Sequence, residues 1–166
     1  MKNNVDEPAG MPSAQSPGIV TGAPFGVQNI NNKLYVTYAK QLGPDNEDDE
    51  AGVGNGFVDV FTPAGKLERR FASRGALNSP WGIAVAPAGF GRLGGNILIG
   101  NFGDGTIGAY DPTTGAFIES LRAPSGVPIT IPGLWALGFP AGSSTLFFTS
   151  GPHDETHGLV GTLTAR

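Results

Sequence analysis

The hexapeptide PWGIAV, residues 80–85, decides the fold because related stretches lie before and after it in the chain. The first is Pro24-Phe25-Gly26-Val27, and the third, more weakly related, is Gly133-Leu134-Trp135-Ala136-Leu137. They follow one another at intervals of about 55 residues. Similarity at a fixed interval is the sequence signature of a protein built from structural repeats.

Each of these stretches is followed by further short apolar runs that glycine and proline separate. In the first two repeats, Thr62-Pro63-Ala64-Gly65 and Asp111-Pro112-Thr113-Thr114-Gly115 come before a fourth run. Proline fixes φ and the closing glycine accepts a positive φ, so both segments predict hairpin turns. The runs lie at 34–38, 56–61 and 66–71 in the first repeat, at 97–101, 105–110 and 116–121 in the second, and at 146–150 and 158–163 in the third.

Four short antiparallel strands in each repeat is the make-up of a β-propeller blade. We therefore expect an all-β fold, a β-propeller fragment of about three four-stranded antiparallel blades, with the last blade lacking its fourth strand. A β-sandwich with accidental internal similarity is the alternative. The predicted division is an N-terminal extension at 1–22, whose Gly18-Ile19-Val20 is suited to donate a strand, followed by blades at 23–79, 80–132 and 133–166.

Composition narrows the functional classes. Hydrophobic residues make up 39% and charged residues 14% of the 166, while 27 glycines and 14 prolines supply many tight turns. The net charge is −4 and Arg69-Arg70 is the largest basic cluster, so nucleic acid is not an expected partner. The chain has no run of 18 apolar residues, so no membrane span is expected. The segment MKNNVDEPAG lacks the apolar core of a signal peptide.

Several longer stretches resemble a family of uncharacterised bacterial β-propeller proteins, distantly related to NHL-repeat propellers and commonly exported. They are APFGVQNINNKLYVTYAK (23–40), GNGFVDVF (54–61), LNSPWGIAVAPAGFG (77–91) and GNFGDGTIGAYDPTTGAF (100–117). The resemblance extends from about Pro8 and corresponds to the C-terminal half of the family's members. It implies a propeller fold and an exported or extracellular location, and it brings no catalytic residue with it.

A propeller fragment leaves two blade faces bare, which would expose a large apolar surface. We therefore expect either a second copy that completes a ring of about six blades, or the missing N-terminal half. A homodimer is the expected form of the isolated chain.

Eight of the 14 acidic residues fall in the loops that join the second and third strands of the three repeats. These loops should share one end of the molecule, because alternating antiparallel strands return the chain to the same end. Several carboxylates together favour a hard cation, of which Ca²⁺ is the expected one. A solvated acidic surface is the alternative. The residues are Asp45, Glu47, Asp48, Asp49, Glu50, Asp104, Asp154 and Glu155.

Both histidines lie in the third of these loops, SGPHDETHG, residues 150–158, and the chain has no cysteine. His153 and His157 have the four-residue spacing of a zinc-binding helix, but Glu155 is at the wrong offset and the flanking glycines favour a loop. A weak Zn²⁺ or Ni²⁺ site would need a carboxylate from another blade, and a polar turn is the simpler interpretation. With the acids, the metal-ligand candidates are Asp45, Glu47, Asp48, Asp49, Asp104, His153, Asp154 and His157.

Four further residues are candidates for a ligand-binding face. Arg74 and Arg122 follow the fourth strands and lead toward the acidic loops, where they would pair with acids or orient an anion. Trp81 and Trp135 begin the first strands, where they either pack in the core or form a stacking platform for a sugar ring.

Two functions stay open on the sequence. The first is a binding or scaffold protein of unknown ligand that is not an enzyme on its own. The alternative is a divalent-metal-dependent hydrolase or lyase whose site forms on the acidic loops only in a complete ring. Nucleophilic catalysis is not expected, because there is no cysteine, no G-x-S-x-G motif, and no histidine outside one loop.

Overall fold

The structure is a computed structural model that describes residues 22–165. Those residues form an all-β fold of three antiparallel sheets, with one short 3₁₀ helix and no α-helix in the described range. The proposed strand donor Gly18-Ile19-Val20 lies outside the described residues. The elements are β1 (Gly22–Ile30), β2 (Lys33–Lys40), β3 (Phe57–Phe61), β4 (Leu67–Ser73), β5 (Pro80–Val85), η1 (Gly91–Leu93), β6 (Ile97–Asn101), β7 (Ile107–Tyr110), β8 (Phe117–Ser120), β9 (Leu134–Gly138), β10 (Thr145–Ser150) and β11 (Leu159–Thr164).

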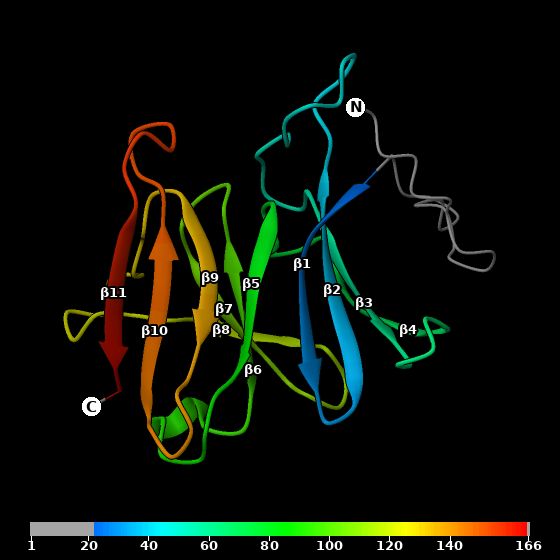
Figure 1. The fold of residues 1–166 in the computed structure, drawn as a ribbon. Helices are drawn as coiled ribbons and strands as arrows, with labels where there is room; N and C mark the ends of the chain where they lie inside the picture. Colours follow the sequence, from blue (N-terminus) through cyan, green and yellow to red (C-terminus); the bar gives the residue numbers. More distant parts are fainter. Residues whose placement is uncertain (1–21, 166) are drawn as a thin grey trace.

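Each sheet follows the order of the chain. The first runs β1-β2-β3-β4, the second β5-β6-β7-β8, and the third β9-β10-β11 (Figure 1). The four-, four- and three-stranded composition predicted from the repeats is confirmed, since each apolar run of the sequence overlaps one of these strands. Within 22–165, β11 pairs with β10 alone.

The two predicted hairpin turns also form. Gly65 has a φ of 78° and donates its amide to the Thr62 carbonyl over 2.9 Å. Gly115 has a φ of 74° and donates to the Asp111 carbonyl over 2.9 Å. Glycine is favoured at both places because this left-handed backbone is costly for a residue with a Cβ.

The first strands of consecutive sheets lie side by side. A Cβ on Gly26 of β1 would stand 2.3 Å from the Trp81 carbonyl oxygen of β5, and a Cβ on Gly82 would stand 2.5 Å from the Trp135 carbonyl oxygen of β9. Thr37 joins the first pair, because its Oγ1 accepts from the Gly26 amide at 2.9 Å and donates to the Trp81 carbonyl at 3.1 Å. The recurring glycine of the repeat therefore lets one sheet approach the next.

Two apolar clusters fill the spaces between the sheets. One joins the first and second sheets through side chains that include Tyr35, Val58 and Ile83. The other joins the second and third sheets through side chains that include Leu98, Ile107 and Leu137. Most of the free energy that holds the sheets together comes from this burial of apolar surface.

Corresponding positions in the three sheets can be matched by strand pairing. Pro24 pairs with Tyr38, Pro80 with Asn101, and Leu134 with Ser150, and these pairs mark one equivalent place in each sheet. Counting from these pairs gives three sets of equivalent apolar residues: Tyr35, Leu98 and Phe147; Val58, Ile107 and Val160; Val27, Ile83 and Leu137.

Within residues 22–165, no helix is long and apolar enough to cross a membrane.

Candidate functional site at the acidic loop end

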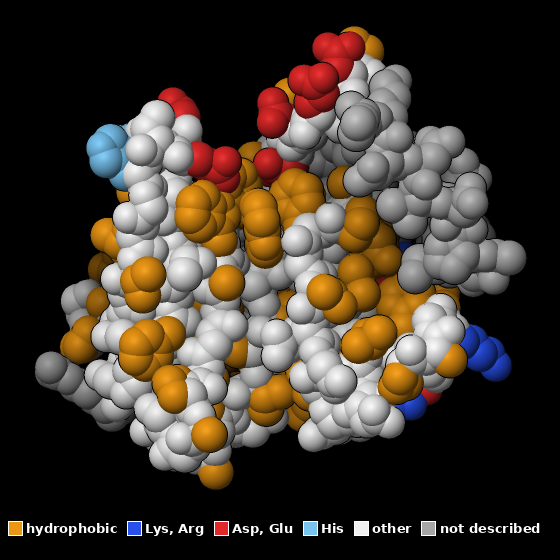
Figure 2. Space-filling model, in the orientation of Figure 1, with side chains coloured by type: hydrophobic (Ala, Val, Ile, Leu, Met, Phe, Trp, Pro, Cys, Tyr) orange, Lys and Arg blue, Asp and Glu red, His pale blue; other side chains and the backbone are white. Residues whose placement is uncertain are grey.

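The three loops between second and third strands emerge at the same end of the molecule, at the top of Figure 1. They span 41–56 between β2 and β3, 102–106 between β6 and β7, and 151–158 between β10 and β11. Figure 2 shows acidic side chains gathered at this end and the histidines beside them. The predicted common end of these loops is therefore where the structure places them.

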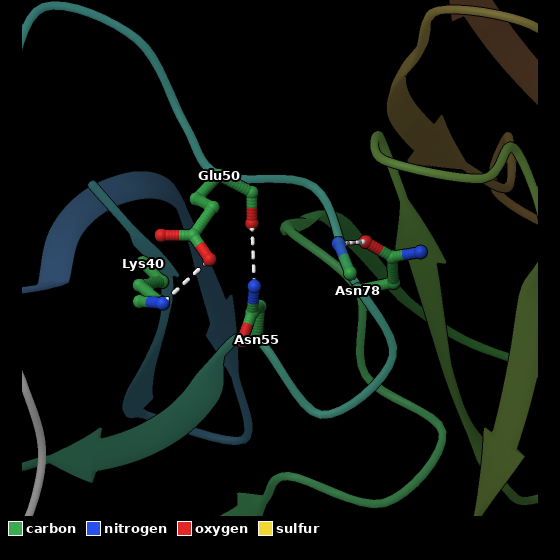
Figure 3. Close-up of polar contacts among 5 residues, drawn as sticks. Lys40, Glu50, Asn55 and Asn78 are labelled. Atoms are coloured by element: carbon green, nitrogen blue, oxygen red, sulfur yellow. Dashed lines mark hydrogen bonds and ion pairs between the residues drawn. The ribbon is translucent and has the colours of Figure 1, made fainter. Parts of the chain in front are cut away.

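The long first loop is fixed at its base by polar contacts. The Lys40 ammonium lies 2.6 Å from the Glu50 carboxylate, and the Asn55 side-chain amide donates to the Glu50 carbonyl at 2.8 Å (Figure 3). The Gly52 amide donates to Asn78 Oδ1 at 2.6 Å, which connects the loop to the segment between β4 and β5. The Glu50 carboxylate therefore has a partner at the end of β2.

Asn78 is buried, with 5% of its surface exposed, and it connects three segments. Besides accepting from Gly52, it donates from Nδ2 to Asp104 Oδ2 in the second loop at 3.1 Å. Its own backbone amide donates to Asn101 Oδ1 at 3.1 Å. Because each polar atom of the side chain is paired, burial of this amide costs little.

Asp104 is held on both carboxylate oxygens. Its Oδ1 accepts from the Thr106 amide at 2.9 Å and from the Thr106 hydroxyl at 2.7 Å, while Oδ2 accepts from Asn78. The Asn101 side chain completes the arrangement by donating to the Thr106 hydroxyl at 3.1 Å and to the Ala76 carbonyl at 2.8 Å. Asp104 therefore serves as an acceptor that positions the second loop.

The other acids of the first loop differ in exposure. Asp45, Glu47 and Asp48 are exposed, and Asp49 is partly buried where it forms an isolated bridge with Gln41. In the part of the chain that the structure describes, no three His, Asp or Glu side chains gather as a metal-binding group. The structure thus places the candidate ligands at one end without bringing three of them together.

The histidine loop is an exposed turn. His153, Asp154 and Glu155 are consecutive residues with positive φ, of 56°, 52° and 60°. The two imidazole rings are 6.0 Å apart between centroids, and His157 Nδ1 lies 2.9 Å from the Thr156 hydroxyl. A turn of left-handed residues is no helix, so these histidines do not occupy one helical face.

Both tryptophans have defined neighbours. Trp135 donates from its indole nitrogen to the Glu155 carboxylate at 2.8 Å, which joins β9 to the histidine loop. Trp81 packs between the rings of Phe25 and Phe102, at centroid distances of 5.0 and 5.6 Å. Trp81 therefore contributes to packing between the first two sheets.

The two candidate arginines lie in different places. Arg74 lines a small cavity of about 210 Å³ with Lys40, Asn55 and Ser73, next to the base of the first loop. Arg122 donates to the Gly126 carbonyl at 2.8 Å and lines a groove with η1 and the end of β11. Arg122 is thus placed with η1 and β11 and not among the acidic loops.

Three ionisable groups have shifted pKa values with physical causes. Burial, followed by the nearby Asp104 charge, raises the pKa of Tyr110. Burial and the Asp59 charge raise the pKa of Tyr38, against a smaller opposing effect of Arg70. Hydrogen bonds from the Thr114 amide and hydroxyl lower the pKa of Asp111, with a smaller contribution from the Thr113 amide.

Sequence reasoning did not assign Asn78, Asn101 or Thr106 to the site. The available signal was that Asn78 lies two residues before the proline of the PWGIAV repeat, where the chain passes from one sheet to the next. Its polar partners come from 26 residues away on either side, so no local pattern identified them.

Comparison with known proteins finds viral relatives. The chain is 35% identical to the uncharacterised protein R648 of Acanthamoeba polyphaga mimivirus over 145 residues, which cover 87% of the chain and 36% of that protein. It is 38% identical to the uncharacterised protein L690 of the same virus over 144 residues, 84% of the chain and 37% of that protein. The chain thus spans about a third of the length of these relatives. No protein-family model matches it.

These relatives correct one expectation. The predicted membership of a bacterial family related to NHL-repeat propellers is wrong, because the relatives found are viral and no such family model matches. The motifs that suggested the resemblance are glycine-rich turns beside short apolar strands, and that pattern arises wherever tight hairpins repeat.

Proposed function

We propose that the chain is part of a β-propeller that acts as a binding or scaffold protein, and that a second copy covers its open faces when the chain is alone. One observation carries the proposal. Positions that are buried between sheets inside the molecule are exposed apolar residues on the outer faces of the first and third sheets. Exposed apolar surface of this kind marks a protein interface.

The exposed fractions make the comparison direct. Leu98 is 0% exposed and its equivalent Phe147 is 41% exposed. Ile107 is 0% exposed, whereas Val160 is 71% exposed. On the opposite side, Ile83 is 4% exposed and Val27 is 66% exposed. In the ring, Phe147 and Val160 of one copy pack against Val27 of the other, as Leu98 and Ile107 pack beside Leu137 within one chain.

The proposed contact between two copies differs in one residue from the contacts between consecutive sheets within one chain. Ala136 stands where Gly26 and Gly82 stand in the first two sheets. Because a Cβ at those glycines would meet the next backbone within 2.5 Å, the two copies need a wider spacing at this point than consecutive sheets within the chain.

The acidic loop end is the proposed ligand-binding face, with Ca²⁺ as the cation to test. The exposed carboxylates of Asp45, Glu47, Asp48 and Asp154 are the groups that such an ion would use there. The alternative, a divalent-metal-dependent hydrolase or lyase, would use the same end in a complete ring, and the gathering of eight acids in three neighbouring loops is what favours it.

Sedimentation equilibrium tests the association. The chain at micromolar concentration is expected to be a dimer, and Val27→Asp or Phe147→Asp is expected to give a folded monomer. Val53→Asp is the matched control, because Val53 is 82% exposed in the first loop and outside the open faces. A folded wild-type monomer would overturn the proposed association.

Thermal melting tests the cation. After chelation, addition of millimolar Ca²⁺ is expected to raise Tm through preferential binding to the folded state. An unchanged Tm with Ca²⁺, and also with micromolar Zn²⁺, would remove the metal-dependent alternative and leave the binding or scaffold function.

A further inference from the structure

A groove of about 780 Å³ lies between the second and third sheets, beside the end of β11. Its apolar lining includes Phe90 and Leu93 around η1, Leu121 and Ile129 after β8, and Leu163 of β11. Its charged lining residues are Arg92 and Arg122. The groove lies on the side of the third sheet that faces the second, since Leu163 packs against the apolar cluster between those sheets.

The corresponding space between the first two sheets is filled by β8 and the turn before it. Phe117 of β8 is paired with Tyr110 of β7, and their rings meet edge to face at 5.5 Å. A Cβ on Gly115 would stand 1.8 Å from the Phe71 carbonyl oxygen of β4, so the turn is in close contact with the first sheet.

Strand pairing shows that the two spaces are equivalent. Tyr110 pairs with Ile97 at the start of β6, and Leu163 pairs with Leu146 at the same place in β10. Leu121 lies four residues after Phe117, and Phe71 lies four residues after Leu67. Leu121 of the second sheet therefore corresponds to Phe71 of the first. The groove is therefore the volume that a fourth strand occupies in the preceding sheet.

The edge of β11 supplies the backbone partners for such a strand. Among residues 22–165, β11 pairs only with β10, whereas β3 and β7 each have a strand on both sides. An unpaired strand edge presents amide and carbonyl groups that bind an extended polypeptide by strand addition.

We propose that this groove binds an extended peptide segment of another polypeptide, antiparallel to β11, with a large apolar residue opposite Leu163 and an acidic residue on the same face. The apolar residue occupies the place that Phe117 has over Tyr110. The acidic residue corresponds to Ser120, which pairs with Gly108 on the same face of the second sheet. The carboxylate would pair with Arg122, which lines the groove and donates to the Gly126 carbonyl. The other lining arginine, Arg92, already pairs with the Glu119 carboxylate.

This binding needs only the second and third sheets and does not depend on a completed ring. Leu163 faces the groove, whereas Val160 pairs with Thr149 on the open face of the same sheet. The two faces of β11 can therefore be tested separately.

The chain's own β8 segment provides the probe. A fluorescein-labelled peptide of sequence AFIESLR, residues 116–122, is titrated with the whole chain and followed by fluorescence anisotropy. Saturable binding is expected. Replacing the peptide's phenylalanine by aspartate is expected to weaken binding about tenfold or more through loss of apolar burial.

Two protein variants on β11 form a matched pair. Leu163→Asp is expected to weaken binding by the same order, while Val160→Asp is expected to leave it unchanged even where it abolishes self-association. Circular dichroism and Tm establish that each variant is folded. Equal binding by both variants, or no saturable binding by the wild-type chain, would overturn the proposal.

A charge exchange keeps the proposal testable if Leu163→Asp does not fold. The wild-type chain is expected to prefer a peptide with aspartate in place of the serine over one with arginine there, and Arg122→Glu is expected to reverse this preference. An unchanged preference contradicts the assignment. Binding that appears only after deletion of residues 1–21, or only as dimerisation of the chain, would show another occupant and also overturn it.

Discussion

Asn78 donates a hydrogen bond from its side-chain amide to the Asp104 carboxylate, and this buried pair joins the segment between the first two sheets to the β6–β7 loop. The same side chain accepts from the Gly52 amide of the β2–β3 loop. Two of the three acidic loops therefore depend on one asparagine that carries no charge.

Replacement of this asparagine should loosen both loops. Asn78→Ala removes two hydrogen bonds and leaves the Gly52 amide and an Asp104 oxygen without their partner, so the free energy of unfolding is expected to fall by about 2–3 kcal/mol. Urea unfolding measures the change, and hydrogen exchange at the Gly52 amide reports the loop. Asn29→Ala is the control, because Asn29 is exposed in β1. Equal losses in the two variants would contradict the role of Asn78.

The approach of consecutive sheets predicts a steric effect at Gly82. A Cβ there would lie 2.5 Å from the Trp135 carbonyl oxygen and 2.8 Å from the Leu137 amide nitrogen. Gly82→Ala is therefore expected to cost about 2–3 kcal/mol of the free energy of unfolding. Gly138→Ala in β9 is the control, since a Cβ at Gly138 meets nothing within 4 Å, and its effect should stay within about 0.5 kcal/mol. A loss at Gly138 as large as at Gly82 would argue against the packing of the first strands.

Asp111 predicts a small pH dependence. Hydrogen bonds from Thr114 favour the ionised carboxyl and lower its pKa in the folded state. Its contribution to stability is thus present above the pKa of the unfolded chain and is lost as the pH falls through the lower folded value. NMR titration of the Asp111 carboxyl should show the low pKa, and Thr114→Ala should raise it. Thr113→Ala should leave it unchanged, because Thr113 contributes only its backbone amide. Equal shifts in the two variants would contradict this cause.

Substitution of Tyr110 is expected to raise the stability of the fold. Its ring is buried between Phe71 and Phe117, but its buried hydroxyl has no hydrogen-bond partner within residues 22–165. A buried polar group without a partner is costly, so Tyr110→Phe is expected to raise the free energy of unfolding by about 1 kcal/mol. Calorimetry measures the change. A loss of stability would show that the hydroxyl has a partner in solution.

The repeat was enough to predict the sheets. Short apolar runs such as 97–101 and 105–110 are separated by glycine, and the turns at Gly65 and Gly115 take the positive φ that their sequence indicates. Glycine and proline set the backbone conformation of a turn over a few neighbouring residues, so a single sequence is enough to predict such turns. The common end of the three acidic loops followed from the same alternation of antiparallel strands.

The partners of the individual acidic side chains could not be predicted in this way. Glu50 pairs with Lys40 and Asp104 with Asn78, and both contacts depend on how separate segments meet. Such contacts are set by tertiary structure and leave little local pattern.

Cross-linking between copies tests the central claim most directly, because the chain has no cysteine of its own. Val27 and Phe147 lie on opposite open faces. Their equivalents share apolar clusters inside the molecule, Tyr35 and Ile83 in one and Leu98 and Leu137 in the other. A Val27→Cys, Phe147→Cys double variant treated with a short bismaleimide is expected to give a covalent dimer at micromolar concentration. Each single variant is expected to stay uncross-linked. A double variant that is folded by circular dichroism yet stays a monomer with two reactive thiols would contradict the account.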